Sequence, residues 1–152
     1  MTVTGEYAPS TSEWVRRQVE EYEASGGTRG TTMRGLPVVL LTMRGARSGK
    51  VRKVPLMKVE HDGAYLAVAS MGGAPKHPQW YHNLLADPRV VVRDGTHVIE
   101  ARARLLRGDE RRVWWERACA AFGDYADYQR RCEREIPLFL LEPTPPGRAA
   151  RR

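Results

Sequence analysis

Apolar positions near the start of the chain recur with a helical period. Apolar side chains follow one another every three to four residues from Val15 to Tyr22, and the run is followed by Ser25-Gly26-Gly27. This spacing predicts an amphipathic N-terminal helix that ends at the glycines. Ser10 and Glu13 have the spacing of a capping box, which would satisfy backbone N–H groups at the start of this helix.

Shorter apolar runs along the rest of the chain predict strands. Residues 36–43 are almost unbroken in apolar character, which is typical of a strand buried on both faces, and IPLFLL at 136–141 predicts a last buried strand. Two other segments place Asp-Gly between apolar flanks, at Asp62-Gly63 and at Asp94-Gly95. A type I′ turn needs positive φ, which Gly allows and Asp tolerates, so each pair predicts an antiparallel hairpin.

The remaining periodic segments predict helices around these strands. Pro78 suits the first turn of a helix that Pro88 ends, and residues 109–134 indicate a further helix with a break near Gly123. The pattern gives six strands, most of them antiparallel. A closed or partly closed barrel is the expected arrangement, because closure removes the exposed edges that such strands would otherwise leave.

Length and composition indicate one globular domain. The chain has 152 residues, 41% hydrophobic and 28% charged, and no apolar run approaches the roughly 18 residues of a membrane span. We expect a flexible N-terminus at 1–11, a single domain at 12–143 and a disordered Pro/Arg tail at 144–152. The N-terminus has neither a basic region nor an apolar core typical of export, which predicts a cytoplasmic location with Cys119 and Cys132 as free thiols.

The positive charge of the chain is local. The formal net charge is +7, but three arginines of the last ten residues reduce this to +4 for the other 142. A nucleic-acid-binding protein would spread Lys and Arg along a face or a helix. Here the dense cluster is residues 43–53, MRGARSGKVRK, with five basic side chains and two glycines. This pattern favours a small anionic ligand and argues against nucleic acid.

The cluster has the chemistry of an anion clamp. Gly45 and Gly49 allow backbone conformations that direct N–H groups at an anion. Further donors come from Arg47, Ser48, Lys50 and Arg52. A solvated basic turn has the same composition and stays an alternative. The P-loop pattern GxxxxGK[ST] is not matched. A second glycine-rich segment, residues 69–76, either lines the same pocket or simply forms a turn.

Three motifs taken together resemble one family. The order RGARSGKVRKVPL, DGAYLAVASMGGAPKHPQWYHNLLADPRV and YADYQRR…IPLFLLEP, between about Leu36 and Pro143, is similar to the deazaflavin-dependent nitroreductases. Members of that family bind coenzyme F-420 on a split β-barrel related to FMN-binding barrels. The resemblance implies an α+β, mainly β fold: a six-stranded antiparallel split β-barrel, FMN-binding-like, with an N-terminal helix and peripheral helices.

The resemblance also implies a cofactor site. Coenzyme F-420, an 8-hydroxy-5-deazaflavin, carries a phosphodiester and glutamates, and these anions suit the basic cluster. Carried over by position, the contacts with this anionic tail are Arg44, Arg47, Ser48, Gly49, Lys50 and Arg52. Pro55 and Leu56 would border the ring, and Ala69, Ser70, Gly72, Gly73 and Lys76 would approach from the other side. Trp80 and Asn83 match the WYHNL motif, with a core role for Trp80 as an alternative. A β-bulge at Pro55 is expected, because proline fits poorly in a regular central strand.

The activity implied by the resemblance is hydride transfer between reduced deazaflavin and an activated acceptor, namely an enone, quinone or nitro compound. Tyr125 and Tyr128 match tyrosines that face the acceptor, although packing alone would also explain Tyr128. Phe122 stands where another residue carries a hydroxyl in the nitroreductases, which argues against nitroimidazole reduction. The histidines lack metal-site spacing, so we expect no metal.

Two other functions stay open: a non-catalytic protein that binds a cofactor or anionic ligand, and an FMN-binding split-barrel oxidoreductase. The expected partner is a small-molecule acceptor. We expect a monomer rather than a dimer, and the N-terminal helix lies on the barrel, covers the pocket or touches a membrane surface as in some relatives.

Overall fold

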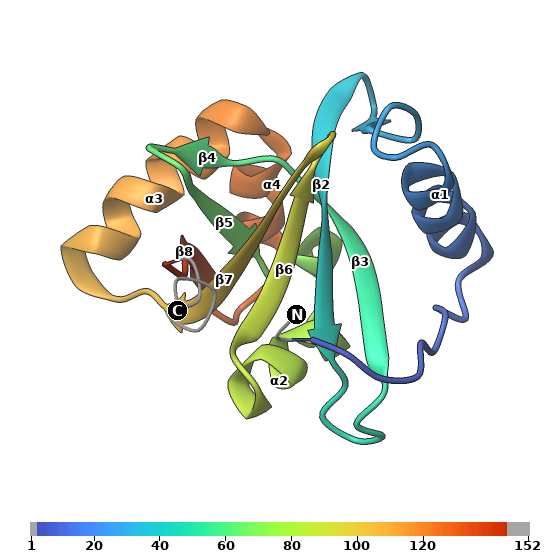
Figure 1. The fold of residues 1–152 in the computed structure, drawn as a ribbon. Coiled ribbons are helices and arrows are strands. Elements are labelled where there is room, and N and C mark those ends of the chain that lie inside the picture. The colour runs from blue at the N-terminus through green and yellow to red at the C-terminus, as the bar shows by residue number, and fades with distance from the viewer. Residues whose placement is uncertain (1–2, 146–152) are drawn as a thin grey trace.

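A curled antiparallel sheet forms the centre of the computed structural model, which describes residues 3–145 (Figure 1). The six longer strands are β2 (Leu36–Arg44), β3 (Val51–Met57), β5 (Ala64–Val68), β6 (Arg89–Asp94), β7 (His97–Leu105) and β8 (Leu138–Pro143). Two strands of two residues each, β1 (Thr32–Met33) and β4 (Glu60–His61), add to the six that the sequence predicts.

The sheet curls into a barrel that stays open along one side. Its strands follow the order β1-β2-β6-β7-β8-β5-β4, and β3 pairs with β2. Within the described residues β3 and β5 do not pair with each other, so a split separates them. The mainly β, split-barrel fold class is therefore confirmed.

The two predicted hairpins have different outcomes. The β6–β7 hairpin is confirmed, although Gly95 has the only positive φ of its turn, where a type I′ turn needs two. Asp62 and Gly63 both have positive φ, but their β4–β5 ladder is only two residue pairs long. The strand before them, β3, pairs instead with β2 over seven residues. The reason is burial, since this longer ladder places β3 beside the buried centre of β2, residues 38–41.

Strand β2 is buried on both faces, as predicted. Val38 and Leu40 belong to one hydrophobic cluster, which includes α1 and α3 residues. Val39, Leu41 and Met43 point to the opposite face and form the barrel interior with residues of β5, β6 and β8. Helices on one side and the curled sheet on the other leave this strand little contact with water, which explains why its sequence does not alternate.

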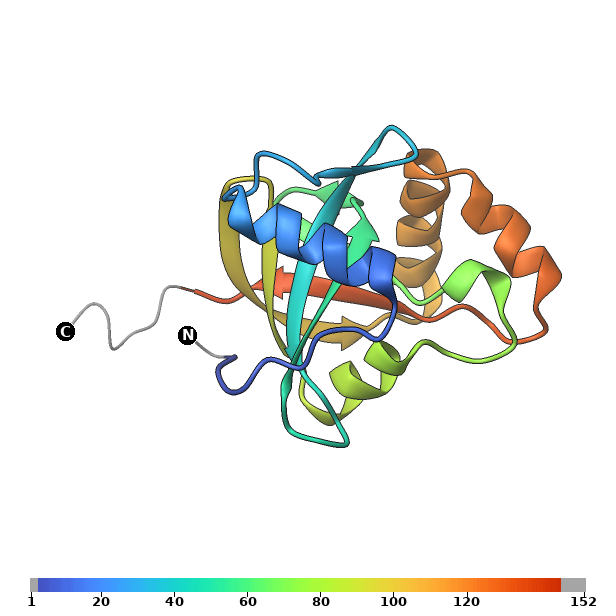
Figure 2. The same ribbon diagram turned by 90° about the vertical axis from the view of Figure 1, so that its right-hand side faces the viewer.

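Helix α1 (Glu13–Ala24) lies across the outside of the barrel (Figure 2) and packs against β3. The hydroxyl of its buried Tyr22 accepts a hydrogen bond from the Gly95 N–H at 2.7 Å. Gly27 has a φ of 88°, and a Cβ there would lie 1.8 Å from the Gly95 carbonyl oxygen. The predicted capping box does not form, because Ser12 is the N-cap and Ser10 Oγ accepts from the Ser12 N–H. The buried side chains of α1, Val19 and Tyr22, thus pack on the barrel.

The other helices lie at the ends and on the far side of the sheet. Helix α2 (Gln79–Ala86) packs against β2, and α3 (Gly108–Ala121) packs against β5 and β8. The predicted break near Gly123 is confirmed, since α4 (Asp124–Arg131) begins directly after it. A short 3-10 turn, η1 (Met71–Gly73), contacts α4.

Of the tail predicted at 144–152, the structure describes Thr144 and Pro145, and residues 146–152 lie outside the described residues. None of the helices within residues 3–145 combines the length and apolar character needed to cross a membrane.

Candidate functional site

The split between β3 and β5 holds a cavity of about 480 Å³. Its lining comes from the start of α1, from β3, from the loop after β5 and from the junction of α3 and α4. The residues are Trp14, Val15, Met33, Arg34, Val54, Pro55, Leu56, Met57, Val68, Ser70, Met71, Gly72, Pro78, Trp80, Phe122, Tyr125 and Tyr128. Arg34 is the one charged residue in this set, so the cavity suits a largely apolar ligand.

Aromatic side chains form one wall of the cavity. Phe122 meets Tyr125 edge to face at 5.0 Å between ring centroids, and Tyr128 lies 6.0 Å from Phe122. Burial raises the pKa of the Tyr125 hydroxyl well above its ordinary value, so this group stays protonated at neutral pH. Phe122 and Tyr125 also pack into the hydrophobic core, which holds this wall in place.

The wall formed by β3 is regular where a bulge is expected. Pro55 pairs with Leu40 in an uninterrupted register that runs from Val38↔Met57 to Arg44↔Val51. The expected bulge is therefore wrong. Proline fits here because β3 is an edge strand at this point: it pairs with β2 on one side and faces the split on the other.

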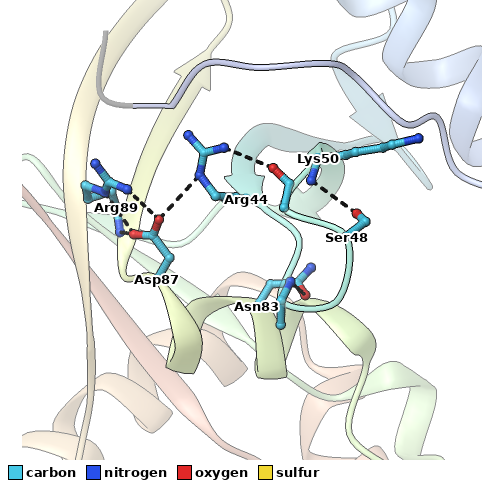
Figure 3. Close-up of polar contacts among 8 residues, drawn as sticks. Arg44, Ser48, Lys50, Asn83, Asp87 and Arg89 are labelled. Carbon is cyan, nitrogen blue, oxygen red and sulfur yellow. Dashed lines mark hydrogen bonds and ion pairs between the residues drawn. The ribbon is translucent and has the colours of Figure 1, made fainter.

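The basic cluster covers the end of β2, the hairpin loop at 45–50 and the start of β3 (Figure 3). The Gly45 N–H donates to the Lys50 carbonyl at 2.7 Å, and the Gly49 N–H donates to the Gly45 carbonyl at 3.0 Å. Ser48 Oγ accepts from the Lys50 N–H at 3.1 Å. Gly49 has a φ of 72°, a conformation that L side chains rarely adopt. We name residues 45–50 the basic loop.

The basic side chains of this region differ in whether a carboxylate of the protein pairs with them. Arg44 donates to the Gly49 carbonyl at 2.9 Å and lies 3.7 Å from Asp87, which also pairs with Arg89 (Figure 3). Lys50 Nζ lies 3.2 Å from a Glu6 carboxylate oxygen. Arg47 and Arg52 form no ion pair with any residue in the described part of the chain. These two are the cations available to an external anion.

Asn83 connects the basic loop to the rest of the molecule. This side chain on α2 is only 3% exposed, and its Oδ1 accepts from the Ala46 N–H at 2.9 Å. Arg44 and Asn83 therefore shape the loop from within the protein, whereas the resemblance implies that they contact the ligand directly.

A narrower cavity of about 170 Å³ adjoins the larger one. Val15, Val54 and Trp80 line both of them. Arg52 and Asn83 also line the narrower cavity, as does Lys53, whose ammonium is paired with Glu23 at 2.6 Å. The two cavities together run from the aromatic wall toward the basic loop, and their character changes from apolar to cationic along the way.

The second glycine-rich segment forms the wall opposite β3. Ser70 and Gly72 line the larger cavity, whereas Ala69 is fully buried behind them. Gly73 has a φ of 82° and packs against the Tyr128 backbone, where a Cβ would lie 2.9 Å from the carbonyl oxygen. Lys76 is exposed and does not line the cavity.

Several residues of the site are absent from the sequence-based set. Trp14 and Met71 stand at the cavity and are 59% and 55% exposed. Arg34, in the β1–β2 turn, pairs with Asp124 at 2.7 Å. Arg134 lies behind the second glycine-rich segment and donates to its backbone carbonyls. For Trp14 the sequence offered one indication, a large aromatic residue at the start of the predicted amphipathic helix. Arg134 had none, because it lies about 60 residues away in sequence.

No cluster of three or more His, Cys, Asp or Glu residues that could hold a metal ion occurs within residues 3–145. Cys119 and Cys132 are free thiols.

A family model, a curated relative and a solved structure all point to the same family of proteins. The model of the F420H(2)-dependent quinone reductase family matches residues 14–143. An F420H(2)-dependent quinone reductase of Mycobacterium tuberculosis is 32% identical over 143 residues, covering 86% of this chain and 96% of that protein. A solved structure described as an F420-H2 dependent reductase is 52% identical, with a TM-score of 0.67 over 70% of this chain and 94% of its own.

A second solved structure corrects the expected oligomeric state. It is described as a domain-swapped dimer and is 48% identical, with a TM-score of 0.70 over 88% of this chain and all of its own. The expectation of a monomer rather than a dimer is contradicted by this relative. A swap exchanges an identical element between two copies and keeps the contacts of the monomer, so the sequence pattern is the same in both states.

Proposed function

The chain belongs to the F420H(2)-dependent quinone reductase family, and we propose that it transfers a hydride from reduced coenzyme F-420 to a quinone-like acceptor. The family confirms the resemblance drawn from the three motifs. When bound, the reduced deazaflavin supplies two electrons as a hydride, which leaves the protein the tasks of orienting the two reactants and excluding water.

One observation carries this proposal: the lining of the two adjoining cavities changes from apolar to cationic along their length. The larger cavity is lined by apolar and aromatic side chains, and the narrower one leads to Arg52 and the basic loop. A ligand with a flat, largely apolar ring and a long anionic tail matches both parts. The residues present therefore fit coenzyme F-420.

The residues that would hold the coenzyme follow from these positions. Pro55, Leu56 and Trp80 would border the ring from β3 and α2, with Ser70 and Gly72 on the opposite wall. Arg47, Arg52, Ser48, Gly49 and Lys50 would receive the phosphodiester and the glutamates. Four residues would act by shaping these walls: Arg44, Asn83, Ala69 and Gly73. Lys76 would meet the coenzyme only if its tail extended past the second glycine-rich segment.

The acceptor would lie against the aromatic wall. Tyr125 and Tyr128 line the cavity on the side away from the basic loop. Because the buried Tyr125 hydroxyl stays protonated, it can donate a hydrogen bond to an acceptor oxygen that gains negative charge. Phe122 lacks a hydroxyl for this purpose, which favours quinone-like over nitro acceptors. The expected cytoplasmic location stays a prediction.

Titration of the purified protein with coenzyme F-420 and with FMN tests the cofactor. We expect binding of F-420 at micromolar concentration or below and much weaker binding of FMN, because one phosphate cannot use all the available cations. Equal or tighter binding of FMN would favour the FMN-dependent alternative. Reduced F-420 that binds tightly but is not oxidised by any quinone tried would favour the non-catalytic alternative.

Replacement of Tyr125 by Phe tests the acceptor side. The variant keeps the aromatic packing and loses the hydroxyl, so we expect quinone turnover to fall roughly tenfold or more while F-420 affinity is unchanged. Leu85→Ala, at an exposed position of α2 outside both cavities, is the control. Normal turnover by Tyr125→Phe with every quinone would make Tyr125 a packing residue.

A further inference from the structure

The Arg134 guanidinium lies behind the loop that follows β5 and contacts it at several points. Nη2 donates to the Ser70 carbonyl at 2.8 Å, Nε to the Ala74 carbonyl at 2.9 Å and Nη1 to the Ala69 carbonyl at 3.1 Å. Nη1 also lies 3.0 Å from His77 Nδ1. One side chain thus binds three carbonyls and an imidazole of a segment about 60 residues earlier in the chain.

This loop has an unusual backbone that requires such support. Met71, Gly72 and Gly73 have φ values of 47°, 64° and 82°, three consecutive residues in the left-handed region. A segment of this shape cannot continue the β ladder, and its own backbone supplies only the Gly73–Ser70 and Ala74–Met71 hydrogen bonds. The Ala69 and Ala74 carbonyls on either side of it accept from Arg134 instead. A planar guanidinium with five N–H donors can serve three carbonyls at once, whereas an ammonium group lacks this fork geometry.

The same loop sets one wall of the cavity. Ser70 and Gly72 line it opposite β3, and Gly73 packs against the Tyr128 backbone of α4. We propose that Arg134 is a positioning residue of the coenzyme site, which holds Ser70–Gly73 at the separation from β3 that the coenzyme ring requires. This inference rests on the proposed function, and it assigns Arg134 no contact with the coenzyme.

The contact with His77 makes the arrangement depend on pH. Arginine only donates, so His77 Nδ1 must accept, and the imidazole is neutral with its proton on Nε2. The ring stacks on Tyr81 at 4.1 Å, and His82 lies 6.3 Å away. Among the described residues no carboxylate pairs with Arg134 or His77. Burial first, and then the charge of Arg134, lowers the pKa of His77.

The direction of the pH effect follows. Because the pKa of His77 is lower in the folded protein, the unfolded chain takes up the proton first, and this contribution to stability falls as the pH drops below about 6.5. A protonated His77 would also place a second positive charge 3.0 Å from Nη1. The support of the loop by Arg134 therefore weakens in acid.

The test compares Arg134→Gln and Arg134→Lys with Arg112→Gln, a change at an exposed arginine of α3 that lines neither cavity. In the coenzyme-free protein we expect faster amide hydrogen exchange at residues 70–74 in Arg134→Gln, a smaller increase in Arg134→Lys and none in Arg112→Gln. With F-420 bound we expect roughly tenfold weaker affinity and a roughly 10- to 100-fold lower kcat, because the ring loses its fixed orientation. Arg134→Lys should retain more of the F-420 affinity and of the kcat than Arg134→Gln does.

A pH series with His77→Gln keeps the test decisive if Arg134→Gln does not fold. The glutamine amide oxygen can accept from Arg134 and does not titrate. As the pH falls through the lowered pKa of His77, the wild-type protein should lose F-420 affinity and exchange protection at 70–74 relative to His77→Gln. Exchange and affinity in the Arg134 variants equal to those of Arg112→Gln, or identical pH profiles for wild type and His77→Gln, would overturn the proposal. Absence of F-420 binding by the wild type would refute the proposed function instead, while hydrogen exchange would still decide the role of Arg134.

Discussion

The two glycine-containing loops of the site are built in opposite ways. The basic loop at 45–50 is held mainly by its own backbone, through the Gly45–Lys50 and Gly49–Gly45 hydrogen bonds, with the Ala46–Asn83 bond as a long-range contact. The loop at 69–74 depends on distant residues, because Arg134 binds its carbonyls and Tyr128 packs on Gly73. A locally closed loop can carry exposed charge at little cost in stability, whereas a loop held from outside can set the width of a cavity.

Replacement of a glycine in each loop should give the largest difference. Gly73→Ala would place a Cβ 2.9 Å from the Tyr128 carbonyl oxygen in addition to straining a φ of 82°. Gly49→Ala strains a φ of 72° but meets nothing within 4 Å. We expect a loss of roughly 2–4 kcal/mol in the free energy of unfolding for Gly73→Ala and about 1–2 kcal/mol for Gly49→Ala. Urea denaturation measures both, and equal losses would contradict the comparison.

Removal of an unpaired cation should separate binding from stability in the basic loop. Arg47→Ala should weaken F-420 binding by roughly 1–3 kcal/mol, the range for a lost charge-assisted contact, and change the unfolding free energy by less than about 0.5 kcal/mol. Calorimetric titration at two salt concentrations should show a smaller salt effect in the variant than in the wild type, since fewer screened contacts remain.

Arg102→Ala is the matched control for this experiment, because Arg102 is exposed on β7 and lines neither cavity. Unchanged affinity and salt dependence in Arg47→Ala would show that the basic loop is a solvated turn.

Loss of the contact from α2 should make the basic loop less ordered. Asn83→Ala leaves the Ala46 N–H without its partner and removes a buried amide, at an expected cost of roughly 1–2 kcal/mol in the unfolding free energy. F-420 affinity should fall with it, although Asn83 need not touch the coenzyme. Leu85→Ala, at an exposed position of the same helix that lines neither cavity, is the control. Full affinity in Asn83→Ala would show that the loop is closed by its own backbone alone.

The smallest expected effect is a gain in F-420 affinity on removal of the Glu6 charge. Glu6 lies 3.2 Å from Lys50 and occupies the lysine with a carboxylate, the same group that the coenzyme tail carries. Glu6→Gln should strengthen F-420 binding by no more than about 1 kcal/mol, because the pair is exposed, and the gain should vanish at high salt. Titration of Glu6→Gln and of Glu6→Gln/Lys50→Ala separates the two residues. A gain that persists without Lys50 would contradict competition for this lysine.

The sequence by itself determined the parts of the protein that depend on neighbouring residues. Helical spacing in α1, the apolar run of β2, the turn at Gly95 and the break at Gly123 are local signals, and the three motifs were sufficient for the family. The charge of the basic loop was also evident, since its residues are contiguous.

The tertiary structure alone decided which strands pair and which basic side chains are left to bind an external anion. The flanks of Asp62-Gly63 suit a hairpin, yet β3 pairs with β2, because a seven-residue ladder against a buried strand outweighs a favourable turn. Arg44 and Arg47 look alike in the motif, but the fold brings Asp87 and the Gly49 carbonyl to Arg44. Arg134 reaches its carbonyl partners only when β8 lies beside β5. Such contacts join segments far apart in sequence, and no local pattern of residue types records them.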